Sequence, residues 1–373
     1  MPTALLALLL TLAPDPAEPG LRAERLYNGV DRVTAIHATP PAGAAEPLLL
    51  LLLDANGNLH AEPAGVRPGR IDLAAVLPDI WRLRRTAYLQ LAVGDIPVGS
   101  ALVLQPMLSR MVPVTEVATN PNGIEYTEVV RWVDEQDETI AAPPRAGDTP
   151  DPLSPPDDPW LSNASPDGRL MSGLRIYPER DIRLRTTHGE ILVALRPDEA
   201  PNTAWNFRHL CAGGFYHGIP FHRVVPMTRD GDPFVIQAGD PTPSGSGGPG
   251  YWLPLEPSRL PHDFGVISMA RDVDPDSAGS QIFFALSRAG TARLDGHYCS
   301  FGVAVDGAET ILAIAGVELA DVARGKPISP PVILETELIP APPRSPGFAR
   351  TPVRPPAAAD AAPRAATPDR VPR

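Results

Sequence analysis

Three stretches in the second half of the chain hold an unusual combination, in which polar side chains stand among large apolar ones. They are Phe221–Pro226, Phe234–Pro241, and Gly265–Ala270 together with Gly279–Phe284. Arg223, in the first stretch, is a permanent cation with rigid donors, and each charge-assisted hydrogen bond that it makes is worth about 1.5 to 3 kcal/mol. The residue types therefore suit chemistry that depends on one cation, an apolar surrounding and a few hydrogen bonds.

Other kinds of site find less support. Gly245–Gly250 has the spacing of a nucleotide-binding loop, but a proline stands where phosphate-binding NH groups are needed and no βαβ unit surrounds it. Ser280 and Cys211 lack an identifiable base and orienting residue for nucleophilic catalysis. The three histidines at positions 209–222 come without a carboxylate or thiolate at ligand spacing. We therefore expect no metal and no cofactor.

The three stretches, followed by Leu294-Asp295-Gly296 and Phe301-Gly302, resemble the cyclophilin family of peptidyl-prolyl cis/trans isomerases. The resemblance covers about residues 174–340, with several motifs in the family's order. It implies an eight-stranded antiparallel β-barrel capped by two helices. It also implies an enzyme that speeds rotation about the Xaa-Pro bonds of polypeptides and assists protein folding. Amide resonance sets a barrier of about 18 to 20 kcal/mol, and millisecond turnover requires about 5 to 7 kcal/mol of preferential transition-state stabilisation.

The resemblance further implies which residues act. Arg223 matches the family's catalytic arginine, thought to donate to the prolyl nitrogen as rotation localises its lone pair. Gln237 is expected to hold the substrate backbone, Phe283 to grip the proline ring, and Tyr298 to donate to a substrate carbonyl. The expected substrate-binding residues are Phe234, Val235, Ala270, Arg271 and Leu294. For a single aromatic residue, barrel core would be the better interpretation; the order of the motifs favours a pocket.

The sequence departs from the family pattern in three places. Arg293 stands where many members have a tryptophan associated with cyclosporin binding, so weak inhibition by that drug is expected. Tyr298 replaces a pocket histidine, and its hydroxyl can still donate a hydrogen bond. The stretch Met227–Pro233 is longer than usual, and its charged residues could alter access or substrate preference.

The elements that must position these residues are mainly strands. Asp181–Leu195 reads as a hairpin around Thr187–Glu190, because apolar and polar residues alternate on both sides. A helix is expected from Pro201 until Gly213-Gly214, and Val332–Ile339 supplies a late strand. A closed or nearly closed β-barrel with helical plugs is the economical architecture.

Composition divides the chain into five parts. We expect a signal-like segment at 1–20, a β-rich module of unknown role at 21–135, a Pro/Asp-rich linker at 136–171, the cyclophilin-like isomerase domain at 172–340, and a disordered Pro/Ala/Arg-rich tail at 341–373. In the second part, apolar runs such as Leu48–Leu53 are separated by turn signals such as Asp54–Asn58. A structural or adhesive role for this module is expected.

Length and charge limit the partners and the location. The 373 residues carry a net charge of −12, which offers no footprint for nucleic acid or an anionic membrane. Ala4–Ala13 has the length of a signal-peptide core and is too short to span a bilayer, so an exported or periplasmic protein without an integral membrane segment is expected. The alternative is a cytoplasmic protein in which this segment is buried. Two cysteines provide no disulfide framework.

Two functions remain open at this point. The first is an isomerase acting on proline-containing polypeptides; the alternative is a non-catalytic scaffold or chaperone that binds proline peptides on the same fold. Arg223, Gln237 and the aromatic wall together favour turnover, because binding alone has less need of a cation. The Ala341-Pro342, Thr351-Pro352 and Ala362-Pro363 bonds of the tail are candidate ligands for the protein's own site.

Overall fold

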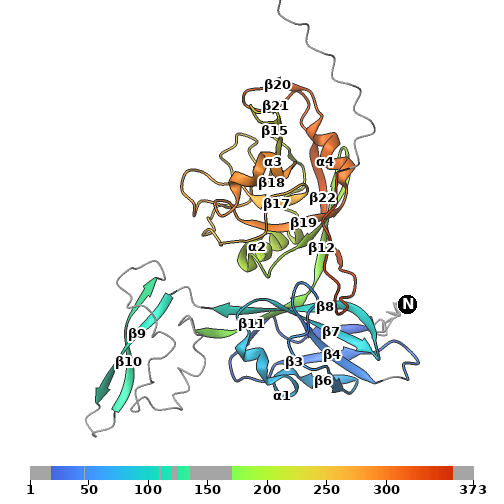
Figure 1. The fold of residues 1–373 in the computed structure, drawn as a ribbon, viewed down its shortest axis with the longest axis vertical. Helices are drawn as coiled ribbons and strands as arrows, with labels where there is room; N and C mark the ends of the chain where they lie inside the picture. The colour runs from blue at the N-terminus through green and yellow to red at the C-terminus, as the bar shows by residue number, and fades with distance from the viewer. Residues whose placement is uncertain (1–17, 46, 109–110, 120–124, 135–169, 356–373) are drawn as a thin grey trace, which may run out of the picture. The chain divides into compact units, whose positions relative to one another are not determined.

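The computed structural model describes residues 18–45, 47–108, 111–119, 125–134 and 170–355, and these form two compact units (Figure 1). The N-terminal unit runs to Glu179 and takes in Pro340–Ala349, and the barrel unit comprises Arg180–Ile339 and the residues from Arg350 onward. The expected signal-like segment, most of the linker and the end of the tail lie outside the described residues, so those expectations stay predictions. In the described ranges, none of the helices has the length and apolar character of a membrane-spanning helix.

The N-terminal unit consists mainly of antiparallel strands, which agrees with the β-rich module predicted from the sequence (Figure 1). Its six-stranded sheet has the order β2 (Tyr27–Gly29), β11 (Met171–Pro178), β8 (Ile96–Leu108), β7 (Ala87–Val93), β4 (Leu48–Leu53) and β5 (Ala64–Val66). A three-stranded sheet has the order β1 (Gly20–Ala23), β3 (Ala35–Thr39) and β6 (Gly69–Asp72). The remaining elements are the hairpin β9 (Met111–Thr119) and β10 (Glu125–Asp134), the helix α1 (Leu73–Val76) and the 3-10 helix η1 (Pro78–Arg82).

The leucine run β4 lies between β7 and β5 in the six-stranded sheet of this unit. Five of its six residues are buried, and it pairs along its whole length with β7. The turn predicted at Asp54–Asn58 follows directly: Gly57 adopts a φ of +82°, and the Asp54 carboxylate accepts hydrogen bonds from the backbone NH groups of Asn56 and Asn58 at 2.8 Å each. The turn prediction is therefore confirmed.

The boundary between the units differs from the one expected at residue 172. Strand β11 pairs with both β8 and β2, so it belongs to the N-terminal unit, and the chain enters the barrel unit only at Arg180. The physical reason is burial, because Leu174 and Ile176 of β11 are part of the apolar core of the N-terminal unit. The linker predicted at 136–171 stays a prediction, because most of it lies outside the described residues, but the start of the following unit is Arg180 rather than residue 172.

The chain after the barrel also differs from the disordered tail expected from residue 341. Arg344 is only 3% exposed, and its guanidinium donates to both carboxylate oxygens of Glu179 at 2.8 and 2.7 Å. The same group lies over the ring of Tyr88, 3.4 Å from its centroid, and the backbone NH of Arg344 donates to Gln90 Oε1 at 2.8 Å. One long side chain therefore anchors Pro340–Ala349 in the N-terminal unit.

The following residues are fixed to the barrel unit. Arg350 forms an ion pair with Asp181 in which both side chains are largely buried, and the backbone NH of Val353 donates to Ala304 O at 2.8 Å. Ala341, which belongs to the N-terminal unit, is 3% exposed, and its carbonyl accepts a hydrogen bond from Ser100 Oγ. Pro342 is exposed, so binding of the Ala341-Pro342 bond by the predicted site stays a prediction.

The barrel unit is built on one antiparallel nine-stranded sheet (Figure 1). Its strands, in spatial order, are β14 (Ile219–Pro220), β22 (Val332–Pro340), β12 (Arg180–Thr186), β13 (Gly189–Leu195), β19 (Ser300–Asp306), β17 (Val266–Met269), β18 (Ile282–Ala285), β16 (Pro233–Ala238) and β15 (Arg223–Met227). The other elements are α2 (Pro201–Ala212), α3 (Arg288–Thr291), the 3-10 helix η2 (Ala292–Leu294), α4 (Ala308–Ala315), and the strand pair β20 (Leu319–Asp321) and β21 (Lys326–Pro327).

The order of the strands shows that this sheet curls. Only Phe221 and His222 join β14, at one edge, to β15, at the other edge. Three Cα steps span at most about 11 Å, so the two edges must be neighbours. This agrees with the predicted barrel; the sheet differs from the expected eight strands by the two-residue β14. The predicted hairpin, the helix from Pro201 and the late strand are confirmed as β12–β13, α2 and β22.

Alternation along the strands gives the sheet two different faces. Val224, Ile236 and Phe284 point into the main core, where they meet Phe207 of α2 and Ile311 of α4. Their neighbours in sequence belong to a separate, smaller apolar cluster. Because successive side chains of a strand point to opposite faces, that cluster lies on the outer face of β15, β16 and β18.

Candidate active site

The smaller cluster contains most of the predicted pocket. Val235, Phe283 and Leu294 are buried, and the other members are only partly buried, so they present apolar surface to solvent. Six of the predicted site residues belong to it, namely Phe234, Val235, Ala270, Phe283, Leu294 and Tyr298. Phe283 and Tyr298 meet edge to face, with ring centroids 5.9 Å apart and planes at 81°.

Strand register places the polar residues beside this cluster. Arg223 of β15 is paired directly with Gln237 of β16, and Gln237 with Phe283 of β18. Directly paired residues share a face of the sheet, so the three side chains form one row across three strands. Arg223 Nη1 donates to Gln237 Oε1 at 3.0 Å. Burial lowers the pKa of Arg223, but an arginine keeps its charge in proteins.

Gln281 orients this pair and was assigned no role from the sequence. Its Oε1 accepts from Gln237 Nε2 at 2.9 Å, and its own amide nitrogen donates to the carbonyls of Gly245 and Gly247 at 3.0 and 2.9 Å. Gln237 was expected to hold the substrate backbone, whereas here its amide is engaged on both sides by protein partners. The sequence signal for Gln281 was its place within the Gly279–Phe284 stretch.

The glycine-rich loop is fixed from its other side by Asp240. This carboxylate accepts from Thr242 N at 2.7 Å and Thr242 Oγ1 at 2.8 Å, and also from Gly245 N. Burial alone would raise the pKa of Asp240, but these bonds and one from Gly247 lower it to about 2. Gly239, which precedes it, has a φ of +94°, and a Cβ there would lie 2.3 Å from Ser280 O, so only glycine fits. The loop thus braces the Arg223 network.

Two arginines stack on the aromatic members of the cluster. The Arg271 guanidinium lies 4.6 Å from the Tyr298 ring centroid and donates to the carbonyls of Asp272, Val273 and His297. The Arg293 guanidinium lies 4.7 Å from the Phe234 ring centroid. Arg271 was expected to bind substrate, and in the structure its guanidinium covers the ring of Tyr298.

Phe283 has a polar support behind it that the sequence did not indicate. The ring of His262 is fully buried and stacks on Phe283, with centroids 5.7 Å apart and planes at 14°. Its Nε2 lies 2.9 Å from Ser268 Oγ and its Nδ1 lies 2.9 Å from Asp295 Oδ1. Although these are the residue types of a hydrolase triad, Ser268 is fully buried beneath the cluster, so its hydroxyl has no access to a substrate.

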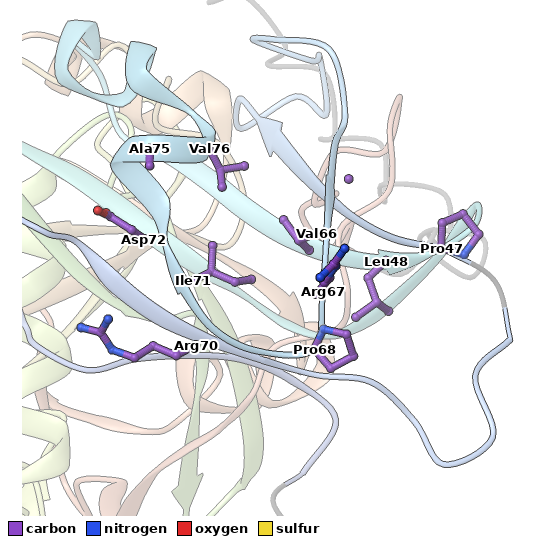
Figure 2. A pocket seen from close by; sticks show the side chains of 11 residues that line it. Pro47, Leu48, Val66, Arg67, Pro68, Arg70, Ile71, Asp72, Ala75 and Val76 are labelled. Carbon is purple, nitrogen blue, oxygen red and sulfur yellow. The ribbon is translucent and has the colours of Figure 1, made fainter.

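Two hollows in the described residues lie away from this cluster. One, of about 570 Å³, lies in the N-terminal unit between β5, β6 and α1 and is lined by Val66, Ile71 and Arg67 among others (Figure 2). The other, of about 440 Å³, lies beside α2 and includes Trp205 and Tyr251. Neither contains a predicted site residue, so the site is defined by the cluster and the arginine network.

Comparison with known proteins identifies relatives of the barrel unit. The family model described as cyclophilin type peptidyl-prolyl cis-trans isomerase/CLD matches residues 181–338. Peptidyl-prolyl cis-trans isomerase 10 of Caenorhabditis elegans is 40% identical over 143 residues, which are 37% of this chain and 83% of the relative. A peptidyl-prolyl cis-trans isomerase of Synechococcus elongatus is 39% identical over 123 residues, covering 33% of this chain and 79% of the relative.

A solved structure of a cyclophilin type peptidyl-prolyl cis-trans isomerase from Cryptosporidium parvum has 30% identity and a TM-score of 0.40, and the match covers 44% of this chain and 99% of that one. The matched region of the family model lies entirely within the barrel unit and includes every predicted site residue. The chain therefore belongs to the cyclophilin-type peptidyl-prolyl cis-trans isomerase family.

Proposed function

We propose that the chain catalyses the cis/trans isomerisation of Xaa-Pro bonds in polypeptides, with Arg223 as the electrostatic catalyst, and that this activity assists protein folding. One observation carries the proposal. The Arg223 guanidinium is held by Gln237 at 3.0 Å beside a solvent-facing apolar cluster, and the partner that holds it is a neutral amide. The positive charge therefore remains available for a substrate.

The reaction needs a donor for the prolyl nitrogen. As the Xaa-Pro bond rotates, amide resonance is lost and the nitrogen becomes a hydrogen-bond acceptor. A guanidinium has five donors, of which one is used for Gln237, so Arg223 can donate to that nitrogen while it stays oriented. Because this bond forms only when the nitrogen lone pair is localised, it stabilises the transition state more than the ground state.

The apolar cluster supplies the remaining stabilisation. Phe234, Phe283 and Leu294 offer a surface for the proline ring, and their apolar character strengthens the interaction of Arg223 with its acceptor by lowering the local dielectric. The Tyr298 hydroxyl can donate to a substrate carbonyl. A charge-assisted bond of about 1.5 to 3 kcal/mol from Arg223 leaves about 2 to 5 kcal/mol for binding and orientation by these groups.

NMR exchange measured on an Xaa-Pro peptide with the full chain tests the proposal. Arg223→Ala is expected to lower kcat/KM about 10- to 150-fold, which corresponds to the loss of one charge-assisted bond. Arg185→Ala is the matched control, because Arg185 is an exposed arginine that pairs with Glu335 away from the cluster. Unchanged acceleration by Arg223→Ala would refute the role of Arg223. Peptide binding by the native chain without acceleration would instead identify a non-catalytic proline-binding module.

A further inference from the structure

The predicted site has positive charges that the protein does not neutralise. Within the described part of the chain, no carboxylate lies at ion-pair distance from Arg223, Arg271 or Arg293. Most other arginines of the barrel unit do have such partners, namely Arg183, Arg185, Arg196, Arg259, Arg288, Arg324 and Arg350. This local group of three arginines stands in a chain of net charge −12.

Of the three, Arg293 is best placed to meet a substrate side chain. Arg223 is partly buried and bonded to Gln237, and the Arg271 guanidinium makes four hydrogen bonds to backbone carbonyls. Arg293 is exposed, and its guanidinium lies 4.7 Å from the ring centroid of Phe234, a wall of the predicted pocket. The stack restrains the side chain while its edge donors face solvent.

The acidic residue that comes nearest to Arg293 in the sequence is already engaged. Asp295, two residues after Arg293, bonds Arg288 and His262, and these partners lower its pKa although burial opposes them. Within the described residues no carboxylate lies at ion-pair distance from Arg293, so its charge is free for a ligand.

We propose that Arg293 makes this site select Xaa-Pro segments that carry a carboxylate side chain close to the proline. The inference rests on the proposed isomerase function and names its substrate class. With the proline ring against Phe234 and Phe283, a side chain one or two residues away can reach the guanidinium stacked on Phe234. An arginine pairs with a carboxylate through two parallel hydrogen bonds, whereas it repels a lysine side chain.

The test uses peptides that share one sequence except at a single position. That position lies close to the proline, on its N-terminal side in one series and on its C-terminal side in the other, and holds Glu, Gln or Lys. At low ionic strength the native chain is expected to isomerise the best-placed Glu peptide about 2- to 5-fold faster, in kcat/KM, than its Gln counterpart. The ratio should approach one at about 0.5 M salt, because screening removes the attraction. Arg293→Gln should bring the ratio to about one at low salt, and Arg293→Glu should transfer the preference to the Lys peptide.

Arg208→Gln is the matched control, because Arg208 makes a similar stack on Trp205 outside the cluster. This variant should keep the native preference. Equal rates for Glu and Gln peptides in the native chain, or a preference that survives in Arg293→Gln, would overturn the inference while leaving the isomerase intact. Failure of the native chain to accelerate any of the peptides would refute the proposed function itself.

Discussion

The buried ion pair between Arg344 and Glu179 gives the most exacting test of the fold. Arg344 is 3% exposed and Glu179 is 7% exposed, and their two hydrogen bonds measure 2.7 and 2.8 Å. Arg344→Met removes the cation and leaves the Glu179 carboxylate buried without a partner of opposite charge. The expected loss in unfolding free energy is about 3 to 5 kcal/mol. For a unit of this size, 3 kcal/mol lowers Tm by about 6 to 12 °C.

Urea unfolding of the full chain, followed by circular dichroism, measures this loss. The double variant Arg344→Met/Glu179→Met should recover much of it, because neither charge then remains buried. Arg70→Met is the control: Arg70 pairs with Glu24 at 2.9 Å but is largely exposed, so its loss should cost less than about 1 kcal/mol. If Arg344→Met costs no more than Arg70→Met, the segment Pro340–Ala349 is not an integral part of the N-terminal unit.

Three further predictions concern the barrel unit. Gln281→Leu should lower kcat/KM about 3- to 10-fold, because Gln237 and hence Arg223 lose their orientation; an unchanged value in the NMR exchange assay would contradict this role. Asp240 has a folded pKa of about 2 against a usual value of 3.8, so its carboxylate stabilises the fold above about pH 4 and this stability is lost as the pH falls toward 2. Asp240→Asn should flatten that acid dependence in urea unfolding, and an equally steep loss in the variant would refute the assignment. Because Arg293 covers Phe234 in place of the family's tryptophan, cyclosporin should inhibit weakly, and submicromolar inhibition of the purified protein would show otherwise.

The sequence was sufficient to predict most of the barrel, and motif order supplied the candidate site residues. Strands and helices follow from local patterns, as the alternation in Asp181–Leu195 and the proline at the start of α2 show. The candidate site residues came from the order of the motifs, and strand register explains how residues from separate motifs come to lie side by side. Arg223, Gln237 and Phe283 lie on three strands that are far apart in sequence but adjacent in the sheet.

Residues whose function depends on distant partners were not predictable. Nothing local in Pro340–Ala349 indicates that Arg344 belongs to the N-terminal unit and meets Glu179, and a proline-rich composition indicates the opposite. His262 is similar, because its support of Phe283 depends on Ser268 and Asp295 from separate segments. Strand β11 was assigned to the wrong unit, since its pairing with β8 joins residues on either side of the linker.

The choice of partner for Arg223 bears on whether the site binds or catalyses. A carboxylate at position 237 would hold the guanidinium more tightly, but it would also compensate the charge that a prolyl nitrogen needs. A glutamine holds the same group through a neutral oxygen, and Gln281 in turn fixes the glutamine. The network therefore supplies orientation without neutralisation. A module that only captured proline peptides would gain little from such an arrangement, because the apolar cluster alone would serve that purpose.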